Sequence, residues 1–584
     1  MKKYLFNNIL FLLVVLSFSN VYGTNNSTTN ERTKAFIQVW GLVKYKSING
    51  AQGKFKADSV FLTLINNVKK ADENQFRELI ALLLKENPGQ PDVHRVHPTN
   101  KSLLTKNIDY GWIKNKLFTS TIQKQLVVLT KTYNPSNTHY FIPTIAYEGD
   151  LPHENAYPNY AFDSEAMNLL ALAKAWNAIA YLFPYRYVMD QKWELTLQQL
   201  IPIFSSIHSR AAYEKSILLL ESALDDTHAS GFLNQVKSLP EIFNLKYYPS
   251  FTYKIYQNYI VVKEFLTDSL AQTSSLKTGD LIVMINGVKT KEWLKQRSIL
   301  LPASNQSVKN RLLADNDAFA FSAIDNAILN VRIKRNHNYL NVQVSLLDRK
   351  DKKVGEIVNT YFKQKYAQEQ LVKGYEDLPN DIALIRAGYF FDKNLPKGDE
   401  MMTFSQNLNK KKAIIFDMRK YPAAPGLFYY FIPMALGKPA FRFAQYFGAD
   451  ISNPGVFSKK DGIEVFLSKD ITTEMPLYTG KIVILTDENT QSMGEWFTMM
   501  LRQLNRNTTV IGNQTAGADG DMKHLNLPGG YEFLFTGNGI FYPNGKETQR
   551  IGIVPDVVYK PSVKDLIATR DMHLAKALQY LTNK

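Results

Sequence analysis

The chain has 584 residues, 45% apolar and 12% aromatic, so it can form several domains with sizeable cores and is not a disordered protein. It contains no cysteine, which excludes disulfides, thiol catalysis and cysteinyl metal sites. The formal charge of +16 is spread along the chain, so a solvated surface explains it better than a nucleic-acid partner, which would need a clustered basic face.

The N-terminus has the pattern of a secretory signal. Two lysines follow the first methionine, residues 9–18 form an apolar stretch too short for a comfortable membrane span, and Gly23 ends a cleavage site. We expect residues 1–23 to be removed and the mature chain, starting near Thr24, to be exported to the periplasm or the exterior of a bacterial cell envelope. Its positive charge would allow peripheral contact with the anionic envelope surface.

Two related helical hairpins are predicted in the first half of the chain. The runs AFIQVWGLVKY (35–45) and ALAKAWNAIAY (171–181) align at an offset of 136 residues, and each precedes a second helical run. We assign one helical module to 24–98 and another to 161–240, and we expect the aligned tryptophans to lie in cores. The segment 99–160, rich in Asn, Tyr and Pro, is expected to be an extended or β-containing connection.

Residues 245–350 resemble a PDZ domain. The stretch 275–293 contains the L-x-x-G-D-x-I-x-x-I-N-G core of such domains, and strands are predicted at 258–265, 326–335 and 341–347. PDZ domains bind a peptide C-terminus by adding it as a strand to an exposed sheet edge. The resemblance therefore implies a domain that collects substrates, or one that is purely architectural.

The C-terminal region, 375–584, has the pattern of an open α/β sheet. Apolar runs predict strands at 382–390, 413–419, 481–485 and 508–513. In such a sheet the functional site lies beyond the carboxyl ends of the strands. Asp417, Ser492 and the glycine-rich stretch 512–520 all follow predicted strands.

Ser492 is the candidate nucleophile of this region. It follows a strand and a polar turn, and it precedes a helix predicted over 494–504 from its apolar spacing. At a helix N-terminus, free backbone N–H groups and the helix dipole favour negative charge. The alternative is a structural role as N-cap, since serine is a preferred cap, and the G-x-S-x-G elbow of the α/β-hydrolases is absent.

The motifs after Ser492 resemble those of the C-terminal processing protease and tricorn group of serine peptidases. TAG (515–517) matches T-x-G, and LPGG, FYPNG and GIVPD follow it without a gap up to Asp556. The resemblance implies a peptidase domain of the ClpP/crotonase-like type over 375–584. It also implies polypeptide substrates and an acyl-enzyme, without a metal or an organic cofactor.

The general base departs from the processing-protease branch of that group. A lysine and a glutamine of that branch are replaced here by Ala518 and Met522, so its Ser-Lys dyad cannot operate. The tricorn-like branch uses a histidine ahead of the PDZ-like domain and a glutamate after the Y-x-P-x-G turn. These positions correspond to His228 and Glu547, so the resemblance implies His228 as base, oriented through a network with Thr227 and Glu547.

General chemistry also favours a histidine. A serine hydroxyl needs a neighbouring base whose pKa lies near the working pH, which an ordinary imidazole provides and a lysine provides only after strong desolvation. Whether Glu547 contacts the ring directly or through Thr227 stays open. Lys523 and His524 are rival bases, of which strand alternation allows at most one to face the site.

The oxyanion hole requires two backbone donors aimed at the developing charge. The N–H of Met493 is the first candidate, because it follows the nucleophile. In the family the second comes from a D-x-R-x-N-x-G-G loop, which reads DMRKYPAAPG here, with Tyr421 for the asparagine. Ala423 and Ala424 replace the two glycines and are the candidate donors.

These observations predict a multidomain α+β and α/β protein that is an exported, tail-specific serine endopeptidase of the tricorn-like branch. We expect it to cleave unfolded or C-terminally tagged polypeptides. Two other functions remain open. One is a catalytically inactive relative that binds peptide termini through its PDZ-like domain, and the other is an architectural envelope protein.

Overall fold

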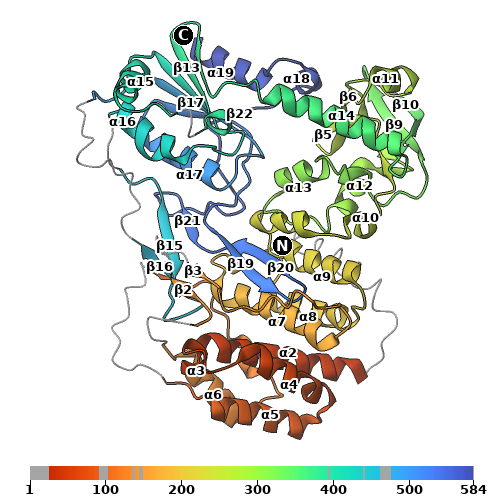
Figure 1. Ribbon diagram of the computed structural model, residues 1–584, viewed down its shortest axis with the longest axis vertical. Helices are drawn as coiled ribbons and strands as arrows, with labels where there is room; N and C mark the ends of the chain where they lie inside the picture. The colour runs from red at the N-terminus through yellow and green to blue at the C-terminus, as the bar shows by residue number, and fades with distance from the viewer. Residues whose placement is uncertain are drawn as a thin grey trace. The chain divides into compact units, whose positions relative to one another are not determined.

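The computed structural model describes residues 25–90, 103–133, 139–143, 149–391, 395–437, 441–460 and 475–582. The predicted signal, 1–23, lies outside these residues. Figure 1 colours the chain by residue number, from red at the N-terminus to blue at the C-terminus. The chain divides into two compact units. The first comprises Met1–Ser238, Gln445–Asp461 and Gly520–Ile540, and the second comprises Leu239–Ala444, Gly462–Asp519 and Phe541–Lys584. Two stretches of the predicted peptidase region therefore belong to the first unit, together with the helical modules.

Two helical hairpins dominate the first unit. They consist of α2 (Asn25–Lys46) with α4 (Ala57–Lys70), and α7 (Glu165–Leu182) with α8 (Trp193–Ser205). The indole N–H of Trp40 donates to the carbonyl of Ala57 at 2.8 Å, and that of Trp176 donates to the carbonyl of Trp193 at 2.9 Å. Each bond spans 17 residues and reaches the first residue of the second helix. The two hairpins are thus closed by the same contact.

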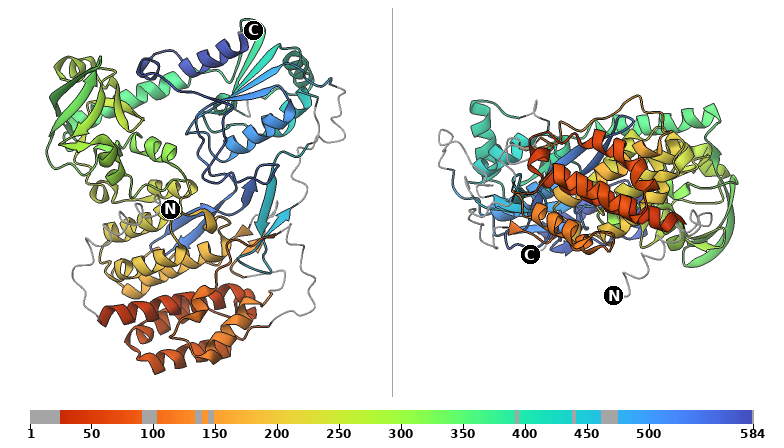
Figure 2. Two further views of the ribbon diagram at one scale, coloured as in Figure 1. Left: turned by 180° about the vertical axis from the view of Figure 1, so that it is seen from behind. Right: turned by 90° about the horizontal axis from the view of Figure 1, so that it is seen from below.

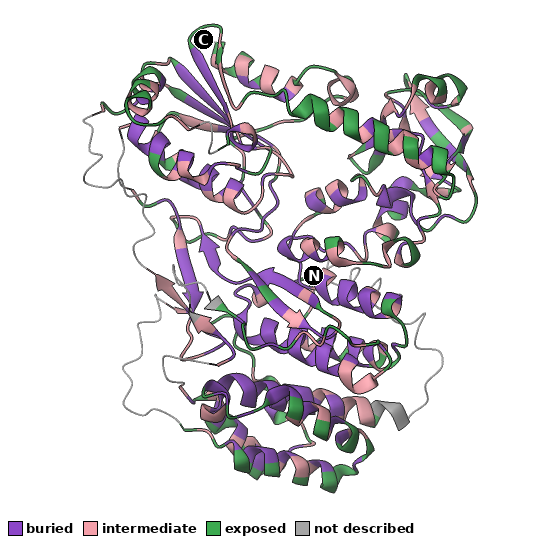
Figure 3. Ribbon diagram, viewed as in Figure 1, coloured by how far each residue is buried: buried purple, intermediate pink, exposed green. Residues whose placement is uncertain are grey.

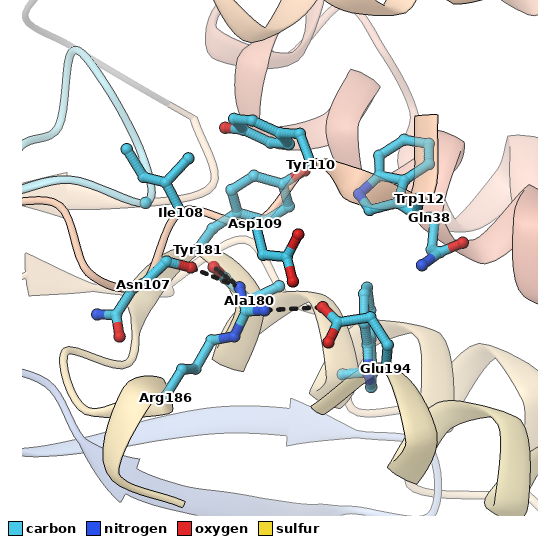
Figure 4. A pocket seen from close by; sticks show the side chains of 12 residues that line it. Gln38, Asn107, Ile108, Asp109, Tyr110, Trp112, Ala180, Tyr181, Arg186 and Glu194 are labelled. Atoms are coloured by element: carbon cyan, nitrogen blue, oxygen red, sulfur yellow. Dashed lines mark hydrogen bonds and ion pairs between the residues drawn. The ribbon is translucent and has the colours of Figure 1, made fainter. Parts of the chain in front are cut away.

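Lys44 has no charged counterpart in the second hairpin. The buried ammonium groups of Lys44 on α2 and Lys174 on α7 contact the carboxylate of Glu154 at 2.5 and 3.2 Å, so one ion cluster joins the two hairpins. Ala180 stands 136 residues after Lys44, and it borders a cavity of about 10 Å³ (Figure 4). Arg186 borders this cavity and pairs with a glutamate of α8 at 2.9 Å. Lys44 thus takes part in an ion cluster, whereas its counterpart Ala180 borders room for about one water molecule.

The connection 99–160 contains a helix as well as short strands. α6 (Ser120–Thr130) is capped by the Thr119 hydroxyl, and Ile122, Leu126 and Leu129 are buried at helical spacing. This apolar period sets the local structure despite the Asn- and Pro-rich flanks, which had suggested an extended segment. The other elements of the first unit include α3 (Ile48–Ala51), α5 (Glu73–Glu86), α9 (Arg210–Ser222), β1 (Leu103–Leu104), β2 (Ile142–Pro143), β3 (Gly149–Asp150), β15 (Gln445–Ala449) and β16 (Phe457–Lys460). The last residue of β21 (Gly539–Phe541) already belongs to the second unit.

A β-hairpin from the peptidase region packs on the second helical module. It consists of β19 (Met522–Leu527) and β20 (Tyr531–Thr536), and β20 lies beside the 3₁₀ segment η5 (His228–Gln235). The free edge of β20 is satisfied by side chains: Glu221 accepts from the N–H of Leu534 at 2.9 Å, and Asp226 accepts from the N–H of Thr536 at 2.7 Å. The surroundings of His228 are therefore built from segments about 300 residues apart.

The second unit contains a six-stranded sheet in the order β12-β13-β14-β17-β18-β22. Its strands are β12 (Tyr375–Leu378), β13 (Ile382–Arg386), β14 (Ala413–Asp417), β17 (Lys481–Thr486), β18 (Thr508–Gly512) and β22 (Val557–Val558). β12 is antiparallel to β13 and all other pairs are parallel, so the predicted strands are confirmed. The central strands are buried (Figure 3).

Helices cover both faces of this sheet. α19 (Met572–Thr582) packs its apolar residues on the face that carries Ile415 and Val483. α17 (Met493–Leu504) lies on the opposite face, where Phe497 stacks on Phe428 (Figures 1 and 2). The sheet and α17 together fix the position of Ser492, which lies between β17 and α17. No helix in the described ranges is long and apolar enough to cross a membrane.

The region 245–350 forms an antiparallel sheet in the order β10-β9-β7-β6-β5, with β8 beside β7. Its main elements are β5 (Phe251–Tyr256), β6 (Tyr259–Phe265), β7 (Leu281–Ile285), β8 (Val288–Lys289), α12 (Thr290–Arg297), α13 (Gln306–Leu313), β9 (Ile328–Arg335) and β10 (Asn338–Ser345). β5 and β10 are the edge strands. α14 (Lys352–Glu369) connects this region to the larger sheet.

Candidate active site

Ser492 lies at a sharp turn between β17 and α17. Its backbone has φ 51° and ψ −117°, a conformation that residues other than glycine rarely adopt. Strain of about 1–3 kcal/mol at such a residue persists only where the surroundings hold it, and such residues cluster at active sites. Here the N–H of Ser492 donates to the carbonyl of Ala518 at 3.0 Å. The chain thus builds a strained strand-to-helix turn around a serine without the G-x-S-x-G sequence.

Glu495, one turn into α17, organises the backbone around Ser492. Its buried carboxylate accepts hydrogen bonds from the N–H groups of Gly517 (2.8 Å), Ala518 (3.0 Å) and Ser492 (3.2 Å). It also accepts from the hydroxyl of Thr515. Burial raises the pKa of Glu495, while these hydrogen bonds favour the charged form. One side chain therefore ties the glycine-rich loop to the nucleophile turn.

Two glycines allow the loop to close around this carboxylate. Gly517 has φ +64°, and an added Cβ would lie 2.7 Å from the backbone of Arg550. Gly552 has φ +68°, and an added Cβ would lie 2.2 Å from the Thr515 hydroxyl. Both positions combine a left-handed backbone with a close approach that excludes a side chain. The T-x-G and G-I-x-P-D motifs therefore form one packed unit behind Ser492.

Helix α13 supports the same loops from the region 245–350. The side-chain amide of Asn305, at its N-cap, donates to the carbonyls of Thr515 (2.8 Å) and Ala516 (3.0 Å). The guanidinium of Arg311 donates to the carbonyl of Glu488, in the turn just before Ser492, at 2.9 Å. The region that resembles a PDZ domain is thus bonded to both loops that position the candidate nucleophile.

The loop after β14 is bonded to the turn that precedes Ser492. The carbonyl of Met418 accepts from the hydroxyl of Thr490 at 2.9 Å, and the N–H of Ala423 donates to the carbonyl of Ala387 at 3.0 Å. Tyr421 lies between these anchors and is exposed.

His228 is oriented by a chain of side chains within the first unit. Its Nδ1 lies 2.7 Å from the hydroxyl of Thr536, which donates to a carboxylate oxygen of Asp226 at 2.9 Å. A threonine hydroxyl has one hydrogen and a carboxylate only accepts, so the oxygen of Thr536 accepts from Nδ1–H. The network therefore places a proton on Nδ1, and in a neutral imidazole this leaves the lone pair on Nε2. An imidazole held in this way can act as a general base through Nε2.

Comparison with known proteins finds a family match for the region around Ser492. Residues 381–559 match the model of the family described as peptidase family S41. This segment is therefore the S41 peptidase region of the chain. A search of curated protein sequences finds no match.

Solved structures resemble larger parts of the chain. Mature CPAF is 10% identical, with a TM-score of 0.50, and the alignment covers 71% of this chain and 96% of that one. The D1 C-terminal processing protease of photosystem II is 14% identical, with coverages of 70% and 99% and a TM-score of 0.33. The tricorn protease is 14% identical, with coverages of 71% and 36% and a TM-score of 0.29. The similarity to CPAF concerns the fold. The S41 domain makes the protein a serine-type peptidase, and its substrates are polypeptides.

The predicted site residues are distributed over the two units. Ser492, Met493 and Glu547 belong to the S41 segment in the second unit, whereas Thr227 and His228 precede it and belong to the first. Thr227 is the buried N-cap residue of η5. Glu547 lies in the turn after β21 and forms an isolated backbone bridge with Phe541. The described contacts of the His228 ring involve Thr536 and Asp226, and a network through Thr227 and Glu547 stays a prediction.

The two predicted oxyanion donors of the loop after β14 lie in different environments. Because the N–H of Ala423 is bonded to the carbonyl of Ala387, it is not available to an oxyanion in this structure. Ala424 is buried.

The two rival bases lie on β19. Lys523 is buried and paired with Asp521, and His524 is exposed and lies 3.0 Å from Glu532. The two rivals thus point to opposite faces of β19, as strand alternation predicts.

Sequence reasoning missed three residues of the S41 site and its surroundings. Glu495 carried a signal, because it lies three residues after a serine at a helix start, the spacing of a capping box. Asp226 stands two residues before His228 and could have been weighed as a partner. Thr536 carried no signal, because only the packing of β20 brings it to the ring. Within the described residues, no group of three or more His, Asp or Glu side chains is placed to hold a metal ion.

Proposed function

We propose that this S41 protein is an exported endopeptidase in which Ser492 attacks the peptide bond and His228 is the general base. The strained backbone of Ser492, held by Glu495, is the observation that carries the proposal. Nε2 of His228 would take the Oγ proton as the bond to the carbonyl carbon forms. The imidazolium would then protonate the leaving amine, and water would hydrolyse the acyl-enzyme by the same route.

A fluorophosphonate probe tests the nucleophile directly. Only an activated serine reacts covalently with such a probe, so native wild-type protein should be labelled at Ser492, as located by peptide mass spectrometry. Heat-denatured protein and the Ser492→Ala variant are the controls, and both should stay unlabelled. A native protein that resists the probe would instead support the peptide-binding, catalytically inactive alternative.

The proposed substrates are unfolded polypeptides captured by their C-termini. β5 is an edge strand, and it shares with α13 a cavity of about 580 Å³. Lys254, Lys263 and Arg311 contribute positive charge to the lining of this cavity, although acidic residues line it as well. An edge strand beside a partly basic cavity suits an added peptide strand that ends in a carboxylate.

Amidation of a long unfolded substrate tests terminal capture. The amide removes the terminal charge, so turnover of the long substrate should fall, while a short internal peptide with blocked ends should be cut at its usual rate. Deletion of the PDZ-like region would be less informative, because it would also remove Asn305 and Arg311, which hold the loops around Ser492. Equal rates for the acid and the amide would exclude terminal capture and favour an architectural region.

Export is tested by the mature N-terminus. The apolar stretch 9–18 and the small residues before Thr24 support removal of residues 1–23. Protein recovered from the periplasmic or external fraction should begin near Thr24 by N-terminal sequencing. Intact Met1 in protein from the cytoplasmic fraction would contradict export.

A further inference from the structure

The antiparallel sheet of the region 245–350 has two edges of different character. At β5 the register with β6 shifts between Thr252 and Tyr253, and Lys254 lies in the strand. β10, at the other edge (Figure 1), pairs with β9 over eight residues without a shift in register. It contains no charged residue and no proline, and six of its eight residues are exposed. Edge strands are usually protected by charges, prolines or bulges, so β10 is open to pairing with another chain.

The outer face of the sheet beside β10 is basic. β8, β7, β9 and β10 together contain four basic residues and no acidic one. Arg335 pairs with Asp280, which directly precedes β7, at 2.6 Å. Lys289, Arg332 and Lys334 form no ion pair with any residue in the described ranges. The positive charge of these three side chains is therefore not offset on this face.

The register places this charge next to the edge strand. Arg332 lies opposite Asn341 of β10 and Met284 of β7, and Met284 lies opposite Lys289 of β8. The guanidinium of Arg332 is 5.0 Å from the ring centre of Tyr339, so its charge is held over β10 itself. A hollow of about 410 Å³ on the same face is lined by Arg332 and by three residues with amide side chains, Asn330, Asn341 and Gln343.

We propose that β10 is a docking edge for an acidic, extended segment of polypeptide, which adds to the sheet as a further strand. Backbone pairing along β10 holds the segment, as in other cases of strand addition. Side chains of a strand alternate between its two faces, so carboxylates at every second position face Arg332 and Lys334. These two lie one strand further in, about 10 Å from the added backbone, a distance that long side chains from both partners bridge. No free C-terminus is required, in contrast to the capture proposed at β5.

Charge and polarity disfavour two other occupants of this edge. A second copy of the chain, paired antiparallel through β10, would place its own cations on the same side of the joined sheet, where the two sets repel each other. An anionic membrane would attract the cations, but it would also have to desolvate the amide groups of Asn330, Asn341 and Gln343. An acidic polypeptide suits the charge, the amide groups and the open edge together.

The test is peptide binding to the mature chain that carries Ser492→Ala, which prevents cleavage. The probe is a short fluorescein-labelled peptide of alternating Glu and Thr with a C-terminal amide, so that capture of a terminal carboxylate cannot contribute. Its matched control has Gln at every Glu position. Fluorescence anisotropy should show about tenfold tighter binding of the Glu peptide, and added NaCl should reduce the difference. Because binding is the readout, the result does not depend on whether Ser492 is the nucleophile.

The charge on β9 is tested by the double variant Arg332→Gln/Lys334→Gln. It should weaken binding of the Glu peptide by about tenfold and leave binding of the Gln peptide unchanged. The matched control is Lys254→Gln/Lys263→Gln beside the β5 edge, which should bind the Glu peptide as the parent protein does. Circular dichroism confirms that both double variants are folded.

Strand addition is tested by two N-methylated forms of the Glu peptide, one methylated at every Glu nitrogen and the other at every Thr nitrogen. The N–H groups of successive residues point to opposite edges of a strand, so only one of the two forms should lose binding.

The proposal would be overturned by equal affinity for the Glu and Gln peptides, for the two N-methylated forms, or for the parent protein and Arg332→Gln/Lys334→Gln. A dimer in analytical ultracentrifugation without peptide binding would also overturn it and assign the edge to a second copy. Binding to phosphatidylglycerol vesicles without peptide binding would assign the basic face to a membrane instead.

Discussion

The proposed nucleophile and the proposed base are held in place by different means. Ser492 is fixed by its own backbone turn and by Glu495, which lies three residues away and gathers N–H groups of the neighbouring loop. His228 is fixed by a chain of side chains, in which its contact with Thr536 joins residues 308 apart in the sequence. The difference shows that local chain geometry can position the proposed nucleophile, whereas the position of the proposed base depends on long-range packing. Substitutions on the two sides should therefore differ in kind.

The largest effect is expected from Ser492→Ala. It should lower kcat by about 10⁶-fold, as loss of a nucleophile does, while the protein folds normally. The matched control is Ser562→Ala, because Ser562 is a helix N-cap in the same unit and caps Asp565. The control should lose about 1 kcal/mol of unfolding free energy and no activity. If Ser492→Ala behaves like the control, Ser492 is only a cap.

His228→Ala should be almost as severe, because the serine hydroxyl loses its base. In the wild type, kcat/KM should fall as the pH is lowered, because a protonated imidazole cannot accept the proton of the serine Oγ. His524→Ala and Lys523→Met are the comparison variants on β19 and should keep most activity. An active His228→Ala enzyme together with an inactive Lys523→Met enzyme would transfer the role of base to Lys523.

Glu495→Gln tests how the nucleophile side is held. The amide group of glutamine cannot accept the N–H bonds that the second carboxylate oxygen accepts from Ala518 and Ser492. The glycine-rich loop should loosen, and kcat/KM should fall by about 10²-fold, since misplacement by about 1 Å costs this much. Fluorophosphonate labelling should slow by a similar factor. Labelling at the wild-type rate would show that the turn holds itself without this carboxylate.

The sequence was informative where structure depends on local pattern. Strands such as 481–485, the helix after Ser492 and the turn that carries the serine follow from apolar period and turn residues. The partners of the His228 ring did not follow, because Thr536 reaches it only through the packing of β20 on η5. The engaged N–H of Ala423 was equally hidden, since its acceptor, Ala387, lies in another loop. Local pattern therefore predicts the elements, and their tertiary packing decides which polar groups remain available.

Thr536 variants sharpen the account of the base side. Thr536→Val keeps the shape but removes the link from His228 to Asp226, so kcat/KM should fall by about 10- to 100-fold, less than the full contribution of a general base. Thr536→Ser retains the hydroxyl and should restore most activity, with the pH profile of the wild type. Glu547→Gln is the comparison, because the family resemblance assigned the orienting role to Glu547. A greater loss for Glu547→Gln than for Thr536→Val would favour that original assignment.

The smallest expected effect concerns stability near the nucleophile turn. Burial, together with the neighbouring charge of Glu488, raises the pKa of Asp487 to about 7, although Asn489 donates to its carboxylate. The folded state then binds a proton more tightly than the unfolded chain, whose aspartate has a pKa near 3.9. The unfolding free energy of the wild type should therefore fall as the pH rises from about 4 through about 7.

Asp487→Asn, which stays neutral, should melt about 1–3 °C above the wild type at pH 8 and show no gain at pH 4.5. Asp325→Asn serves as control, because Asp325 is fully exposed and the attraction of Lys246 lowers its pKa. That control should show no gain at pH 8. A gain for Asp487→Asn that is equal at both pH values would mean that the substitution acts through packing, and that the charge of Asp487 does not strain the turn before Ser492.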